Sequence, residues 1–130
     1  MTKWLFKEEP SHYGFEHLEM DGAATWEGVR NNTALRNLSM VKKGDEIIYY
    51  HTGDEKAAAG LAESTSDAYR DEEGFWVVRI RPVRKFRKRV TLRTIKEEGR
   101  FSSSPLVRLP RLSVMPVDDE LWNFIIGHSE

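Results

Sequence analysis

Apolar and polar positions alternate most regularly in residues 75–86, in the second half of the chain. A period of two separates the side chains onto the two faces of an extended segment, so this segment is predicted to be a half-buried strand. Pro82 has no backbone N–H to donate, and we expect a bulge or a sheet edge at that position. The buried face would carry Trp76, Val78 and Ile80, and the outer face Arg79 and Arg81.

Shorter apolar segments predict the other strands. Residues 46–51 are rich in β-branched and aromatic side chains, which favour a strand, and residues 3–7 form a similar short segment. Residues 57–69 begin with small side chains, which would let another chain segment or a ligand come close. The acidic turn at residues 70–74 would join this strand to the next one as a hairpin.

Capping and turn residues predict helices between the strands. Gly22 would end a helix over residues 15–21, and a second short helix is expected over residues 33–40. Thr91 and Asp118 are placed to cap two further helices. Together, the predicted strands and helices indicate an α+β domain over residues 1–130. A mixed, mostly antiparallel sheet would curve into a partial barrel and carry four or five short helices.

Composition agrees with a single globular domain. The 130 residues are 39% hydrophobic and 32% charged. The absence of cysteine excludes disulfides and thiolate metal sites. No apolar run reaches the ~20 residues of a membrane span, and the first residues lack the layout of a signal peptide. We therefore expect a cytoplasmic monomer with no membrane partner.

Charge is segregated along the chain although the net charge is only -1. Residues 79–100 hold ten of the twenty Lys and Arg residues and two acids, whereas residues 45–73 hold nine acids and two bases. One face could therefore meet an anionic partner without the whole protein being basic. The alternative is that these cations only solvate the outer face of a strand.

Few residues suggest catalysis, a metal or a cofactor. There is no glycine-rich phosphate loop and no GxSxG motif. Lys7 is followed by Glu8 and Glu9 at the end of a strand, and such a Lys/Glu pair could act as acid and base, or could form a salt bridge of small energetic weight. The histidines have neither HxH nor HxxxH spacing, so we expect no metal site; they are His12, His17, His51 and His128.

Two segments could instead hold a planar ligand. The first, WEGVRNN, places the Trp26 indole beside polar groups, and such a ring can stack on a nucleobase with ~1–3 kcal/mol. Arg30 and Asn31 could then bond to the edge of the base or to a phosphate. The second segment, RLSVMPV, offers the Ser113 hydroxyl and the apolar Met115 side chain. Alternatively, Trp26 is a core residue and RLSVMPV is a connector packed under the sheet.

Five motifs in one order carry a family resemblance. WLFKEEP, WEGVRN, GDEIIYYH, GLAE and RLSVMPV follow one another from Trp4 to about Phe124, and this series resembles the EVE domain of the PUA-like superfamily. Two positions depart from the family pattern. Glu8 replaces the usual serine, and Asn32 stands where an aromatic residue is frequent. Both departures bear on the choice of ligand more than on the fold.

The resemblance implies a PUA-like pseudobarrel that recognises a modified nucleobase without catalysis. The base would be a modified cytosine in DNA or a modified base in RNA. Flipping a base out of its stack costs a few kcal/mol, which stacking and hydrogen bonds would offset. The residues expected to bind the base are Lys7, Trp26, Val29, Arg30, Asn31, Tyr50, His51, Arg111, Leu112, Ser113 and Met115.

The basic segment would then contact the nucleic-acid backbone. Phosphate contacts position a strand without reading its sequence, and they make binding weaker as salt rises. The residues expected to do this are Arg79, Arg81, Arg84, Lys85 and Arg87.

Two other classes of function stay open at this point. ASCH domains, which are PUA-like relatives, include amidohydrolases that act on acetylated cytidine, and the candidate residues for such an activity are Lys7, Glu9 and Thr52. The third class is a protein-interaction domain, which would not retain nucleic acid at low salt.

Overall fold

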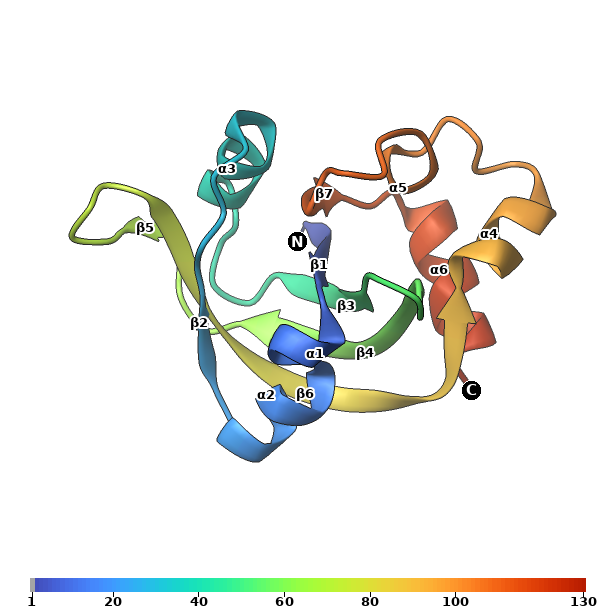
Figure 1. Ribbon diagram of the computed structural model, residues 1–130, viewed down its shortest axis with the longest axis horizontal. Helices are drawn as coiled ribbons and strands as arrows, with labels where there is room; N and C mark the ends of the chain where they lie inside the picture. The colour runs from blue at the N-terminus through green and yellow to red at the C-terminus, as the bar shows by residue number, and fades with distance from the viewer. Residues whose placement is uncertain (1) are drawn as a thin grey trace.

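The computed structural model describes residues 2–130, and one curled sheet of seven strands organises it (Figure 1). The strands follow the order β2-β6-β4-β3-β1-β7, and β5 pairs with β6 outside this path. In chain order they are β1 (Lys3–Glu8), β2 (Ala24–Trp26), β3 (Glu46–His51), β4 (Ala57–Ser64), β5 (Tyr69–Arg70), β6 (Trp76–Thr91) and β7 (Val114–Pro116).

The pairing is mixed and mostly antiparallel, which confirms the predicted fold class. Among the strands of residues 2–130, only β1 and β3 run parallel, with Lys3 opposite Glu46 and Glu8 opposite His51. The other paired strands are antiparallel. A parallel pair needs a long crossover, and the chain between β1 and β3 supplies β2 and three helical segments.

Six helical segments lie in the described part of the chain, and two of them are single turns that periodicity does not predict. Two helices begin at the expected caps: the Thr91 and Asp118 side chains accept bonds from the N–H groups of Thr94 and Leu121. Gly22 ends its helix at φ 77°. The segments are α1 (Pro10–Tyr13), α2 (Phe15–Asp21), α3 (Asn32–Ser39), α4 (Leu92–Glu98), α5 (Pro105–Arg108) and α6 (Asp119–His128).

Strand β6 is longer than predicted and curves along the whole sheet in Figure 1. Its register with β4 shifts beside Pro82, so the bulge expected at this proline is confirmed. The strand continues to Thr91, which caps α4. Because β6 pairs with β2, β4 and β5, it fixes the curvature that brings distant parts of the sheet together.

Small residues in β4 admit an aromatic ring of the protein itself. Gly60 lies under the side chain of Phe15 from α2, and a Cβ at Gly60 would stand 2.6 Å from that ring. The Phe15 ring is fully buried and meets Tyr49 edge-on, with centroids 5.5 Å apart. The close approach predicted for this strand is therefore made by α2. Within residues 2–130, no helix has both the length and the apolar character that crossing a bilayer requires.

The substitution Gly60→Ala should lower the free energy of unfolding by about 1–3 kcal/mol, because the added methyl group would clash with the Phe15 ring and displace it. Urea unfolding followed by circular dichroism measures this. The matched control is Gly127→Ala in α6, where a Cβ would meet nothing within 4 Å. The control should not destabilise, since alanine favours a helix. Equal stability of the two variants would contradict the packing described here.

Candidate functional site

The two ends of the strand order face each other across an unpaired seam. Strand β2 ends one side of the sheet, and β1 with β7 forms the other. Three rings close the gap: the Trp26 ring centroid lies 5.1 Å from that of Phe6 and 5.3 Å from that of Tyr49. Trp26 is only 6% exposed, so its indole is part of the core as well as the edge of β2.

A cavity of about 220 Å³, called here the seam cavity, opens where these edges meet. Its volume is about seven times the ~30 Å³ that one molecule occupies in liquid water. It is smaller than the ~300–1,000 Å³ typical of sites for drug-sized ligands. It therefore suits a single ring. Its lining residues come from both sequence segments singled out above and from β1: Lys7, Glu8, Trp26, Glu27, Gly28, Val29, Arg30 and Ser113.

The turn after β2 shapes one wall of the seam cavity. Gly28 takes φ 82°, a conformation that residues with a side chain rarely adopt. The Arg30 guanidinium then lies 3.7 Å from the Phe75 ring centroid and donates to the Val29 carbonyl at 3.1 Å. Asn31 Oδ1 accepts from Ala34 N at 3.0 Å, which caps α3. The wall is thus held by local bonds before any ligand arrives.

Lys7 supplies a buried cation on the opposite wall. Its side chain is 8% exposed, and Nζ donates to the Pro110 carbonyl at 3.1 Å and lies 5.6 Å from the Tyr50 ring centroid. No carboxylate of residues 2–130 forms an ion pair with it. Burial lowers the pKa of the Lys7 ammonium from its ordinary 10.5. The group retains donors for an acceptor atom placed in the cavity.

A second hollow, the arginine groove, is lined by residues that adjoin those of the seam cavity along the chain. It measures about 330 Å³ and lies between the start of α3 and the segment that joins α5 to β7. The backbone passes directly from one site to the other at two places, Arg30 to Asn31 and Leu112 to Ser113. The groove is lined by Asn31, Thr33, Arg108, Leu109, Pro110, Arg111 and Leu112.

The third hollow, the acidic cleft, lies on another side of Trp26 and has a volume of about 400 Å³. Glu8, Asp21 and Glu27 give it a negative lining. Trp26 lines both this cleft and the seam cavity. Its Nε1–H donates to no atom of residues 2–130, and no buried side-chain nitrogen there lacks a partner, so this N–H is accessible to solvent.

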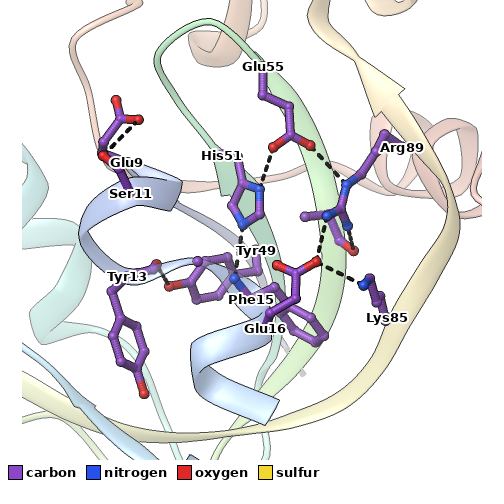
Figure 2. Close-up of polar contacts among 12 residues, drawn as sticks. Glu9, Ser11, Tyr13, Phe15, Glu16, Tyr49, His51, Glu55, Lys85 and Arg89 are labelled. Atoms are coloured by element: carbon purple, nitrogen blue, oxygen red, sulfur yellow. Dashed lines mark hydrogen bonds and ion pairs between the residues drawn. The ribbon is translucent and has the colours of Figure 1, made fainter. Parts of the chain in front are cut away.

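Three of the eleven residues expected to bind the base are buried away from these hollows, which corrects the expectation. Tyr50 and Met115 are 3% and 1% exposed and pack in the core. His51 is 1% exposed, and both ring nitrogens are engaged: Nε2 accepts from Phe15 N at 2.9 Å and Nδ1 lies 2.7 Å from Glu55 Oε1 (Figure 2). His51 therefore fastens α2 to the end of β3. The remaining eight line the seam cavity or the arginine groove.

The basic residues of β6 do not line the seam cavity or the arginine groove either, although Arg79 lies opposite Thr25 beside Trp26. Two of the five expected phosphate contacts are held in ion pairs: Arg81 with Glu63 at 3.1 Å and Lys85 with Glu16 at 2.8 Å. The Lys85 hydrogen bond is the main cause that lowers the pKa of Glu16 to about 2. Arg79 donates to the Thr25 hydroxyl at 2.7 Å, while Arg84 and Arg87 are exposed.

The three residues considered for an amidohydrolase do not surround one cavity. Lys7 faces the seam cavity, but Glu9 and Thr52 do not line it. The Glu9 carboxylate accepts from the Ser11 hydroxyl at 3.4 Å, and the backbone N–H of Thr52 donates to Glu8 O at 2.9 Å. The geometry gives this candidate set no common site.

Sequence reasoning missed part of both sites. In the seam cavity it missed the two carboxylates Glu8 and Glu27, and in the arginine groove it missed Arg108. Arg108 could have been found from the sequence, because RLPRLS places Arg108 and Arg111 on either side of a proline just before Ser113. In the sequence, Glu8 stands out only as a departure from the family pattern that bears on the choice of ligand, and nothing local distinguishes Glu27 from other surface acids.

Comparison with known proteins shows the family to which the chain belongs. The model of the EVE domain matches residues 2–128. The chain belongs to the EVE domain family. Human thymocyte nuclear protein 1 is 26% identical to it over 167 residues, which cover 99% of this chain and 74% of that protein.

Solved structures share the fold of this EVE domain. The NMR structure of Rpa0253 from Rhodopseudomonas palustris is 32% identical, with a TM-score of 0.93 over 99% of this chain and 93% of that one. The crystal structure of human THYN1 in complex with 5-methylcytosine-containing DNA has a TM-score of 0.84 at 24% identity, over 100% and 98% of the two chains. An ASCH protein from Zymomonas mobilis is more distant, with a TM-score of 0.56 at 12% identity over 98% of both chains.

The buried ammonium gives a prediction about pH. The pKa of Lys7 is lower in the folded state than its ordinary 10.5. At pH values between the folded-state pKa and 10.5, the unfolded chain therefore binds more protons than the folded protein. Stability should therefore rise with pH across that window in the wild type, relative to Lys7→Met, which cannot titrate. Urea unfolding of both proteins from pH 7 to pH 10 measures the difference, which should change steadily in favour of the wild type. Lys88→Met, at an exposed position, is the control; parallel curves for wild type and Lys7→Met would contradict burial of the charge.

Proposed function

We propose that this EVE domain is a non-catalytic reader that binds nucleic acid and holds one modified pyrimidine, such as a modified cytosine, in the seam cavity. The observation that carries the proposal is the meeting of Trp26–Arg30 with Lys7 and Ser113 around a hollow of single-ring size. The complex of human THYN1 with 5-methylcytosine-containing DNA supports the choice of ligand.

The groups around the cavity suit the edge of a cytosine. That base offers an amino donor at N4 and carbonyl and ring-nitrogen acceptors beside it, and carboxylates accept from N4 in known readout. Glu8 and Glu27 supply carboxylates, and Lys7 supplies a donor for a carbonyl oxygen. A methyl group on the ring would contact apolar surface of Val29 or Trp26.

Trp26 would act as a fixed wall more than as a freely exposed stacking platform. Its small exposed area and its packing on Phe6 and Tyr49 leave the ring one orientation. A wall that is already ordered costs little conformational entropy on binding, which helps to offset the few kcal/mol needed to flip a base. Absence of a common site for Lys7, Glu9 and Thr52 supports a binding role over hydrolysis.

The proposal predicts that a fluorescent single-stranded oligonucleotide with one 5-methylcytosine binds better than the same strand with cytosine. One buried methyl is worth about 0.8 kcal/mol, or about fourfold in Kd. Lys7→Gln should weaken binding of the modified strand by roughly 10- to 100-fold, since a hydrogen bond to a charged group contributes about 1.5–3 kcal/mol. Fluorescence anisotropy gives both values.

The matched control is Arg93→Gln, which removes one exposed cation on α4, far along the chain from the cavity. It should leave the ratio between the two strands unchanged. Equal affinity of the wild type for both strands, with no effect of Lys7→Gln, would reject the proposed function.

A further inference from the structure

We infer that the arginine groove holds the sugar and phosphate that adjoin the base in the seam cavity, with Arg108 and Arg111 as the phosphate contacts. The inference rests on the proposed function and assigns the path of the strand. It moves the backbone contact from β6 to the segment between α5 and β7.

The lining of the arginine groove has the mixed character of a nucleotide site. Leu109 is 41% exposed, and with Pro110 and Leu112 it provides an apolar surface. Arg108 and Arg111 are both exposed at its rim, and in the described part of the chain neither forms an ion pair with a carboxylate. An apolar surface suits a sugar ring, and guanidinium forks suit phosphate oxygens.

The groove is placed where the next nucleotide would have to lie. Besides the two backbone connections described above, Lys7 joins the hollows directly, because it lines the seam cavity and its Nζ bonds to Pro110 O in the groove. The Asn37 side chain donates to Val114 O at 2.8 Å and ties α3 to β7. This bond holds the two sides of the groove at a fixed separation.

Electrostatics oppose the other routes to Trp26. The acidic cleft adds Asp21 to Glu8 and Glu27, which it shares with the seam cavity, and the three carboxylates together would repel a phosphate. On β6, Arg81 and Lys85 already have carboxylate partners. Arg84 and Arg87 of the same strand form no ion pair within residues 2–130, but they line neither hollow, whereas Arg108 and Arg111 line the arginine groove beside the seam cavity.

The test compares two double variants that each remove two exposed arginines: Arg108→Gln with Arg111→Gln in the groove, and Arg84→Gln with Arg87→Gln on β6. The probe is the fluorescent strand with one 5-methylcytosine, and its Kd is measured from 50 to 300 mM KCl. Each phosphate contact on a single strand contributes about 0.7 to the slope of log K against log salt, so the groove variant should lose about 1.4 from the slope. The β6 variant should keep the wild-type slope.

The preference for the modified strand gives a second readout, since phosphate contacts position a strand without reading its bases. The groove variant should therefore bind more weakly but keep the wild-type ratio between modified and plain strands. An unchanged slope in the groove variant, or an equal loss in the β6 variant, overturns this inference while the proposed function stands. Failure of the wild type to bind either strand overturns both.

Discussion

The contact of Trp26 with Phe6 and Tyr49 is the constraint on which the site depends. A curled sheet with two unpaired ends must close them with side chains, because no ladder of backbone bonds joins β2 to β1. The three rings make this closure, and the seam cavity is the space left beside it. The same indole is thus a structural residue and a wall of the candidate site, which gives the site a fixed shape in the free protein.

A polar network holds the part of the sheet that carries this closure. His51 accepts from the N–H of Phe15 and contacts Glu55, whose carboxylate pairs with Arg89 at 2.8 Å (Figure 2). Glu16 on α2 joins Arg89 at 2.9 Å, so α2, β3 and β6 are linked. Because the Phe15 ring packs on Gly60 and contacts Tyr49, this network fixes the position of Tyr49 and hence that of Trp26. Cations of β6 such as Lys85 and Arg89 therefore stabilise the fold through these ion pairs.

Local signals in the sequence predicted the longer strands and helices but not β2 or the single-turn helix α1, and long-range pairing decided the site. Alternation in β6 and the caps Thr91 and Asp118 are local features, and they were predicted correctly. Glu16 pairs with Lys85 and Arg89, about seventy residues away, and such pairing has no local signature. The basic segment therefore appeared from the sequence to be available for phosphate. His51 similarly looks like a ligand contact until α2 is placed over it. The motifs indicated that Trp26 and Ser113 belong together, but only the closed seam shows how small the shared space is.

The most direct measurement follows the indole N–H signals in ¹⁵N NMR spectra during titration with the methylated strand. Trp26 Nε1–H is accessible, whereas Trp4 Nε1–H is buried in a 2.9 Å bond to Asp45, which makes Trp4 an internal reference. The account predicts that the Trp26 signal, assigned by its loss in Trp26→Phe, shifts with the bound fraction while the Trp4 signal stays in place. Binding that leaves the Trp26 signal unmoved would contradict entry of the base into the seam cavity.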